Sequence, residues 1–381
     1  MSTHTSISVK PTSASEPEAN RTPPLTANDA IVDVGIPTLG TSRYLGESIE
    51  SVFAQTLPGW RLVISENGPG LESVRRLLEP YLSDPRVRHV VTGKKVGRGT
   101  NHNLLLRAGR APYVGLLHDD DRWHPQFLER RVRFLEEHPS CGFVYSGHVV
   151  IDDAGHAQGR TRLRPGSGVH TSASILPLLY RRNSIGCPTV VVRRTAYEAV
   201  GIGYPDILNY DFPMWLRLAA RFDVGCMAVW DADYRLHDGQ ASSNRTRLAE
   251  QRFPVLHAVS DLPFSPSLRR LVYAEAHVLC ALDAVERGER RRATDHLKRA
   301  MRIDAFAVAH PTIAARMLIA LGALAGGERG RQALSKWRER RWQVGGAEGL
   351  LDMPRSRRGA SQRDQIRVGE QPGRSRLQRR G

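Results

Sequence analysis

The sequence alternates strand-like and helix-like segments from residue 31 onward, and this alternation limits the fold more than any other feature. Short apolar runs predict buried strands, and the stretches between them carry apolar residues at helical spacing. This order is typical of an α/β protein whose mostly parallel sheet has helices on its faces. The expected strands are 31–37, 61–67, 87–93, 113–117 and 141–152, with a strand that runs into a short helix over 188–201 and a strand and loop over 224–239; helices are expected over 42–55, 71–82, 100–108, 127–135 and 214–221, and a looser region over 153–180.

One strand, Tyr113 to Leu117, leads almost directly into three consecutive aspartates, Asp119, Asp120 and Asp121. Open α/β sheets bind ligands at the carboxyl ends of their strands, which is where these side chains are expected to lie. Adjacent carboxylates repel one another, so a fold that holds them together usually adds a cation. Hard oxygen ligands suit Mg²⁺ or Mn²⁺, ions that commonly hold nucleotide phosphates. A solvated acidic turn is the alternative, but the strand before and the helix after favour a metal site.

Two more strand ends are expected beside the aspartates. The first strand runs into Pro37 and Thr38, and the second ends at Glu66 and Asn67. A backbone turn with an acidic side chain at this edge can read a nucleobase and a ribose through hydrogen bonds. A plain turn is the alternative for Asn67, since Asn-Gly is a strong turn pair.

The loop after the third strand is basic and contains Lys94, Lys95 and Arg98. Its Gly-Arg-Gly sequence does not match the dinucleotide-binding pattern, which follows the first strand and includes a third glycine. We therefore expect Arg98 and its neighbours to meet the negative charge of a phosphate.

The chain is ordinary in its apolar (40%) and charged (25%) content, but its net charge is +16. Much of this charge comes from arginines in the last segment, which has few large apolar residues and is expected to be disordered. The expected organisation is a disordered leader over 1–29, an α/β domain over 30–246, a helical region over 247–344 and a basic disordered tail over 345–381. Within the helical region, 274–301 predicts two amphipathic helices around a turn at 287–289, and 312–325 predicts a third.

The cysteines, the N-terminal segment and the longest apolar stretch indicate the cellular compartment. The four cysteines are scattered without a CxxC pair, so neither disulfides nor a zinc site is expected. The N-terminal segment lacks the apolar core of a signal peptide. The longest apolar stretch, 313–325, contains Arg316 and is too short to span a bilayer. We expect a cytoplasmic protein whose basic tail makes at most peripheral contact with the anionic inner face of a membrane.

Several segments resemble the inverting glycosyltransferases of family two, in the same order along the chain. IPTLGTSRYLGESIESVFAQT (36–56) is similar to the first strand and helix of that family, and GRGTNHNLLLRAGRAPYVGLLHDDDRWHP (97–125) to the pattern around its D-x-D-D motif. GIGYPDILNYDFPMWLRLAA (201–220) and Tyr234-Arg235-Leu236-His237 with Ser242 resemble two later motifs. The resemblance covers about 31–245 and implies the GT-A nucleotide-diphospho-sugar transferase fold, a mixed, mostly parallel sheet flanked by helices, here with a C-terminal helical extension.

The resemblance also implies roles for individual residues. It makes Asp211 the catalytic base, and it places Asp119 at a variable position where it can replace a missing acid. Three departures from the family pattern are His118 for the first acid of the motif, Tyr210 for the glutamate before the base, and Glu66 for the usual aspartate. The implied nucleotide-sugar-binding residues are Pro37, Thr38, Glu66, Asn67, Arg98, Asn103, Asp119 and Asp120, and the implied metal-binding residues are Asp120, Asp121 and His237.

We expect, from this resemblance, a glycosyltransferase that uses Mn²⁺ or Mg²⁺ and inverts the configuration of the transferred sugar. The donor would be a nucleotide-diphosphate sugar (a UDP-sugar first, a dTDP- or GDP-sugar otherwise), and the acceptor a glycan, a lipid-linked or a small molecule. Processive members carry Q-x-x-R-W, and because 338–342 lacks the glutamine, transfer of a single sugar is favoured.

The sequence also bears on two other classes of function. The departures at His118, Glu66-Asn67 and Tyr210 support, as an alternative, a non-catalytic nucleotide-sugar-binding or scaffold protein of the same fold. Specific nucleic-acid binding is not expected, because the basic charge is not accompanied by a recognisable reading helix or by aromatic residues among the basic ones.

Overall fold

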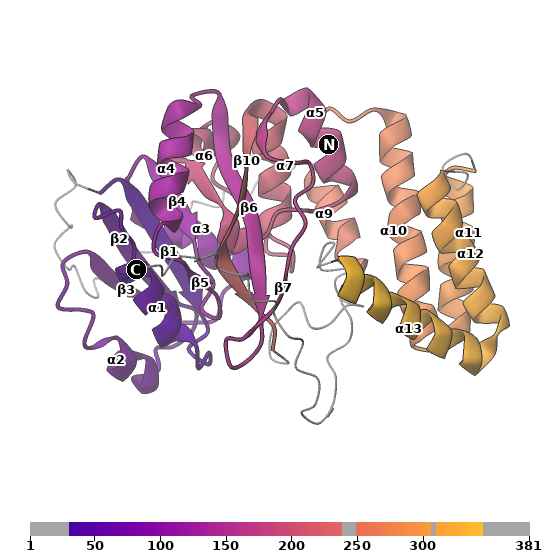
Figure 1. Cartoon of the computed structure of the whole chain (residues 1–381), viewed down its shortest axis with the longest axis horizontal. Coiled ribbons are helices and arrows are strands. Elements are labelled where there is room, and N and C mark those ends of the chain that lie inside the picture. Colours follow the sequence, from indigo (N-terminus) through magenta and orange to yellow (C-terminus); the bar gives the residue numbers. More distant parts are fainter. Residues whose placement is uncertain (1–29, 238–248, 306–309, 346–381) are drawn as a thin grey trace, which may run out of the picture.

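A ten-stranded sheet, with helices packed on both faces, forms the centre of the computed structural model, which describes residues 30–237, 249–305 and 310–345 (Figure 1). The strands lie across the sheet in the order β3 (Val87–Val91), β2 (Trp60–Glu66), β1 (Val32–Thr38), β4 (Tyr113–Leu116), β9 (Val191–Arg193), β6 (Cys141–Ile151), β10 (Asp223–Arg235) and β5 (Arg122–Trp123). Two short strands, β7 (Ala157–Arg160) and β8 (Gly168–His170), pair with β6 and β10. The expected α/β fold with a mixed sheet is confirmed.

Each face of the sheet has its own hydrophobic core. Leu62 and Ile64 of β2 belong to one core and Val63 to the other, because successive side chains of a strand point to opposite faces. The first face is covered by α1 (Leu45–Phe53), α2 (Glu72–Leu78) and α4 (Phe127–Glu137). The second face is covered by α3 (Arg98–Ala108), α5 (Ser172–Arg181), α6 (Arg194–Val200), α7 (Asp211–Arg221) and α9 (Arg252–Ala258).

The first, second and fourth strands end at one edge of the sheet, as the sequence predicts. β1 pairs in parallel with β2 on one side and with β4 on the other. Thr38 lies opposite Glu66, and Gly35 opposite Leu116. The residues that follow these strands are therefore brought together from three separate parts of the sequence.

The region 153–180 is more regular than its composition predicts. It contains β7 and β8, and it ends in the ten-residue helix α5. Ile175, Leu176, Leu179 and Tyr180 recur at helical spacing and pack into the second core. The preceding Gly- and Arg-rich stretch hides this pattern in the sequence, and Pro177 inside the helix weakens the helical signal further.

The C-terminal helices lie to one side of the sheet, drawn in orange and yellow in Figure 1. They are α10 (Pro266–Glu286), α11 (Arg290–Ile303), α12 (Pro311–Ala325) and α13 (Gly327–Gly345). The predicted turn between α10 and α11 is confirmed, and Gly288 adopts a positive φ of 77° there, a conformation that glycine adopts at little cost. α10 contributes Val272 and Ala276 to the second core and packs against α11, α12 and α13 in a third.

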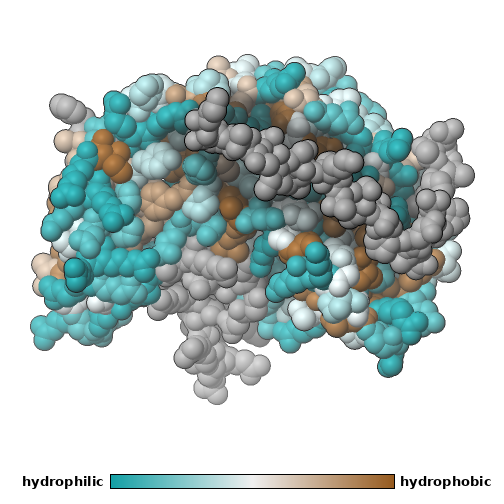
Figure 2. Space-filling view, turned by 180° about the vertical axis from the view of Figure 1, so that it is seen from behind, coloured by the Kyte–Doolittle hydropathy of each residue, from teal (hydrophilic) through white to brown (hydrophobic). Residues whose placement is uncertain are grey.

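Other expectations fall outside the described residues. These are the leader over 1–29, the domain boundary near 246, Ser242, and the tail beyond residue 345 with its membrane contact. None of the described helices combines the length and the apolar character that crossing a bilayer requires. On the side of the molecule seen in Figure 2, hydrophilic residues predominate and hydrophobic ones form several small groups.

Candidate functional site

The first of the three aspartates is tied to the end of β1. The Thr38 hydroxyl donates a hydrogen bond of 2.5 Å to Oδ2 of Asp119, and the Ser42 hydroxyl donates one of 2.7 Å to the Asp119 carbonyl oxygen. Burial, with the neighbouring charge of Asp120, raises the pKa of Asp119 to about 6 despite the hydrogen bond from Thr38. The predicted meeting of Thr38 and Asp119 is therefore present in the structure.

Asp121 is the most buried of the three, with its side chain fully enclosed. Its Oδ1 accepts a hydrogen bond of 2.9 Å from the backbone nitrogen of Arg235, but its Oδ2 has no hydrogen-bond partner among the described residues. Nδ1 of His118 lies 3.4 Å from that oxygen. Burial and the charge of Asp120 raise the pKa of Asp121 to about 7. A buried carboxylate oxygen without a partner is costly, and a cation would satisfy it.

Asp120 faces a different histidine. Nε2 of His237 lies 3.1 Å from Oδ2 of Asp120. Burial would raise the pKa of Asp120, but His237 and His118 together lower it, and the same contact raises the pKa of His237.

One ligand atom from each of His118, Asp120 and Asp121 lies within 4.8 Å of the other two, a spacing that fits one divalent cation. The predicted pair of metal-binding aspartates is present in this group. His237 contacts one member of the group, Asp120, and its own role as a ligand stays a prediction.

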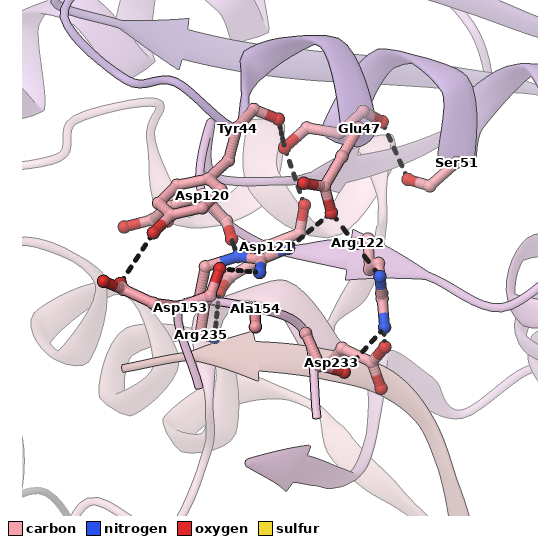
Figure 3. Close-up of polar contacts among 12 residues, drawn as sticks. Tyr44, Glu47, Ser51, Asp120, Asp121, Arg122, Asp153, Ala154, Asp233 and Arg235 are labelled. Carbon is pink, nitrogen blue, oxygen red and sulfur yellow. Dashed lines mark hydrogen bonds and ion pairs between the residues drawn. The ribbon is translucent and has the colours of Figure 1, made fainter. Parts of the chain in front are cut away.

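Arg235, at the end of β10, holds in place the loop of residues 118–121, called the acidic loop below (Figure 3). The Arg235 side chain is almost fully buried, and its Nε donates a hydrogen bond of 3.0 Å to the Asp120 carbonyl oxygen. Nη2 lies 2.6 Å from a carboxylate oxygen of Glu47, and the guanidinium packs 4.1 Å above the Tyr44 ring. Nη1 donates to the carbonyl oxygens of Asp152 and Asp153. These contacts fix the backbone from which the aspartates project.

Asp211 occupies the first position of α7. Its Oδ1 accepts a hydrogen bond of 2.9 Å from the backbone nitrogen of Phe212. The preceding residue, Tyr210, is buried, and its hydroxyl lies 2.8 Å from Nε2 of His118. The start of α7 is thereby joined to the acidic loop. Burial raises the pKa of Asp211 above its usual value, although the charge of His118 opposes this.

At the end of β2, the side chains of Glu66 and Asn67 form hydrogen bonds with neighbouring segments. Oε1 of Glu66 accepts a hydrogen bond of 2.6 Å from the Leu71 nitrogen, and Oε2 lies 3.1 Å from Nε2 of His89. The Asn67 side chain both accepts from the nitrogen and donates to the carbonyl oxygen of Val96. Both residues are buried at the predicted edge, and their roles in binding a donor stay predictions.

The other expected donor-binding residues differ in exposure. The Asn103 amide pairs with the backbone nitrogen and oxygen of Tyr204, which ties α3 to the loop before α7. Arg98 is exposed at the start of α3, and Pro37 is half-buried in β1. Donor contacts for these three residues also stay predictions.

Sequence reasoning did not assign a role to His118, Tyr210 or Arg235. His118 and Tyr210 were noted as departures from a family pattern, but nothing in the sequence indicated that they contact each other across 92 positions. Arg235 was noted only as part of a motif. The signal that could have found the first two is that both departures fall beside residues with expected catalytic or metal-binding roles.

Residues 33–199 match the model of the family described as Glycosyl transferase family 2. The chain is 27% identical over 238 residues to TuaG of Bacillus subtilis, whose name describes it as a glycosyltransferase of teichuronic acid biosynthesis. The match covers 61% of this chain and 90% of that protein. It is 21% identical over 257 residues to WfgD of Escherichia coli, named UDP-Glc:alpha-D-GlcNAc-diphosphoundecaprenol beta-1,3-glucosyltransferase, covering 67% of this chain and 95% of that protein.

Solved structures share the fold at lower sequence identity. Residues 1–349 of TarS from S. aureus, in complex with UDP-GlcNAc, superpose with a TM-score of 0.58 and 13% identity, covering 82% of this chain and 92% of that chain. The mannosyltransferase PcManGT from Pyrobaculum calidifontis, in complex with GDP-Man and Mn²⁺, superposes with a TM-score of 0.51 and 19% identity, covering 87% of both chains. At these identities the likeness concerns the fold.

Proposed function

We propose that this chain, a glycosyltransferase whose residues 33–199 match the model of family 2, requires a divalent metal ion and transfers a single sugar from a nucleotide sugar with inversion at the anomeric carbon. The observation that carries the metal requirement is the buried Oδ2 of Asp121, which accepts no hydrogen bond among the described residues and lies within ligand distance of Asp120. Asp120 and Asp121 would hold a Mn²⁺ or Mg²⁺ ion, whose charge stabilises the nucleoside diphosphate as a leaving group.

The protein residues around the ion would do the rest of the chemistry. Arg235 fixes the acidic loop, and Thr38 orients Asp119 beside it. Asp211 would accept the proton of the acceptor hydroxyl as that oxygen attacks the anomeric carbon from the side opposite the diphosphate. A positioned general base contributes about 10²–10⁴-fold to a rate. The bond from Tyr210 to His118 supports this role, because it keeps the start of α7 beside the metal site.

The donor is proposed to be a UDP-sugar, with GDP- and dTDP-sugars as the alternatives. TarS and PcManGT, which share the fold, were solved with UDP-GlcNAc and GDP-Man. The acceptor is proposed to be a glycan or a lipid-linked precursor, since the name of WfgD specifies a sugar on diphosphoundecaprenol. A non-catalytic nucleotide-sugar-binding protein is the alternative, and measurable transfer by the wild type in the second experiment below separates the two functions.

The acceptor has a candidate place beside α9, a helix that is joined to the loop before Asp211. A cavity of about 570 Å³ lies between α9, α10 and α11 and is lined by aromatic and charged side chains, including Phe253, Tyr273 and Arg292. Gln251, at the start of α9, accepts a hydrogen bond from the backbone nitrogen of Leu208, three residues before Asp211. Aromatic faces beside charged groups suit a sugar ring, so Phe253→Ala should raise the KM for acceptor and leave donor binding unchanged.

The first experiment is a thermal-shift screen of the purified protein with UDP, GDP, dTDP and CDP, each with and without Mn²⁺. A ligand that binds only the folded state stabilises it by about 2.7 kcal/mol at a hundredfold excess over its Kd. We expect one nucleotide to raise the melting temperature only when the metal is present. If no nucleotide does so, the metal-dependent reaction is ruled out.

The second experiment tests the base. Asp211→Asn should lower kcat by at least about 10²-fold, because the amide cannot accept the proton. Donor binding, measured by calorimetry, should remain nearly unchanged. Asp206→Asn is the matched control and should keep kcat, since Asp206 lies in the loop before α7 and contacts the backbone and hydroxyl of Thr100. If Asp211→Asn loses donor binding together with activity, Asp211 is not the base.

A further inference from the structure

The ring of His118 is held by one nitrogen and presents the other to the acidic group. Nε2 lies 2.8 Å from the Tyr210 hydroxyl, and Nδ1 lies 3.4 Å from Oδ2 of Asp121. Two atoms that each bind one ion at about 2.1 Å are separated by about 3.0 Å in octahedral and about 3.4 Å in tetrahedral geometry. The position of Nδ1 relative to Asp121 is thus that of a second ligand of the same ion.

Tyr210 has the position of an orienting partner for such a ligand. A histidine that binds a metal usually has its other ring nitrogen engaged, which fixes both the tautomer and the ring orientation. Tyr210 is itself immobilised, because it is buried and its ring centroid lies 4.1 Å from that of His102. The orientation of His118 is therefore set by packing around α3 and α7.

We propose that His118, oriented by Tyr210, is a ligand of the metal ion and makes the site prefer Mn²⁺ or another transition metal over Mg²⁺. This inference rests on the proposed metal-dependent function and specifies the metal. Mg²⁺ demands oxygen ligands, whereas imidazole suits transition metals. One imidazole and two carboxylates, from His118, Asp120 and Asp121, make a mixed set.

The inference also accounts for two of the departures from the family pattern noted in the sequence. His118 stands where the pattern has an acid, and Tyr210 stands where it has a glutamate before the base. These two residues contact each other in the structure. A histidine ligand usually has its other ring nitrogen engaged, and the Tyr210 hydroxyl does this for His118. The second departure therefore supports the first, and together they change the metal preference rather than remove the site.

The test measures metal binding directly, on the full-length protein without donor, by calorimetric titration with Mn²⁺ and with Mg²⁺. The wild type is expected to bind Mn²⁺ at least about tenfold more tightly than Mg²⁺. His118→Asp, which supplies an oxygen ligand, is expected to reduce that ratio at least about tenfold. His118→Asn is measured in parallel, in case two adjacent acids prevent folding, and should move the ratio in the same direction. An unchanged ratio in a folded variant overturns the inference.

The orienting role of Tyr210 has its own control. Tyr210→Phe should weaken Mn²⁺ binding by about 10–100-fold, as loss of a partner of a metal-binding histidine does elsewhere. Tyr204→Phe removes a neighbouring buried hydroxyl that bonds to Tyr197 instead, and it should leave Mn²⁺ affinity unchanged. Equal affinities for the wild type and Tyr210→Phe would remove Tyr210 from this role.

A spectroscopic measurement identifies the ligand atom itself. Pulsed electron paramagnetic resonance of the Mn²⁺-loaded wild type should show hyperfine coupling to an imidazole nitrogen. His118→Asp, which keeps His237, should lose the coupling that comes from His118, and a coupling that is unchanged in this variant would come from His237 and would overturn the inference. Absence of the coupling in the wild type overturns the inference but leaves the proposed function standing. Absence of any metal binding by the wild type would instead overturn the metal requirement of the proposed function.

Discussion

Buried aspartates near the two ends of β1 differ in the partners of their carboxylate oxygens. At the start of the strand, Asp33 accepts hydrogen bonds from the guanidinium groups of Arg61 and Arg194 and from the backbone nitrogen of Ala111. At its end, Thr38 contacts an acidic loop in which Asp121 leaves one oxygen without a hydrogen-bond partner.

Asp231 on β10 resembles Asp33. It pairs with Arg131, which is fully buried, and with Arg130. Burial would raise the pKa of Asp231, but the two arginines lower it, whereas the pKa of Asp121 is raised. The difference teaches that burial alone does not define a site in this protein. An aspartate matched by arginine stabilises the fold, and an aspartate left unmatched is available to bind a cation.

The largest effect is expected from breaking a matched pair. Arg131→Met should lower the free energy of unfolding by about 3–5 kcal/mol, because Asp231 would keep a buried charge with its main partner removed. Urea denaturation measures this. The double variant Arg131→Met with Asp231→Leu should recover most of the loss. A single variant as stable as the wild type would contradict the assignment of this pair to stability.

Removing the charge of Asp121 should have the opposite effect: a loss of activity without a loss of stability. Asp121→Asn is expected to reduce transfer by about 10²–10³-fold, the cost of losing one electrostatic contact to the transition state. The stability of the metal-free protein should stay equal or rise, since a buried carboxylate beside Asp120 has become neutral. Kinetics and thermal melting of the same preparation check both. A large fall in melting temperature would place Asp121 with Asp33 and Asp231.

Mn²⁺ should stabilise the folded protein through Asp121 and not through Asp231. At a hundredfold excess over its Kd, Mn²⁺ should stabilise the wild type by about 2.7 kcal/mol. It should have no such effect on Asp121→Asn, while Asp231→Asn should respond as the wild type does. Denaturation with Mn²⁺ and with a chelator measures this. A lost response in Asp231→Asn would mean that the two groups are coupled.

The smallest effect is a pH dependence from Asp231. Because its pKa is lowered in the folded protein, its contribution to stability is present above the unfolded value of about 3.9 and is lost as the pH falls below that value. The difference in unfolding free energy between the wild type and Asp231→Asn should be constant from pH 7 to pH 5 and shrink toward pH 3. A difference that grows on acidification would show that the shift has the opposite sign.

The sequence predicts the acidic group and its place better than it predicts the partners. Apolar runs that end in Thr38, Glu66 and the aspartates were enough to place three strand ends together, because parallel strands end at one edge. Pairing of Asp33 with Arg194 joins residues 161 positions apart, and Asp231 with Arg131 joins residues 100 apart. No local pattern encodes such distances, so the arginine partners of Asp33 and Asp231 could not be predicted from the sequence.

The direction of β9 and the presence of α5 also could not be predicted from local sequence patterns. β9 runs antiparallel to both β4 and β6, although its apolar residues look like those of the parallel strands. α5 forms because Ile175 and Leu179 pack into the second core, which is a tertiary effect. Local propensity could not have decided either.

The contacts of Arg235 also set the order in which this protein can become active. Its side chain reaches Glu47, the carbonyl of Asp120 and the carbonyls of Asp152 and Asp153, residues between 82 and 188 positions earlier in the chain. Pairings over such separations form late, after the entropy of closing long loops has been lost. The acidic loop is therefore braced only after β10 has joined the sheet. During synthesis a growing chain would therefore gain the helices and strands that precede β10 before it can turn over a donor.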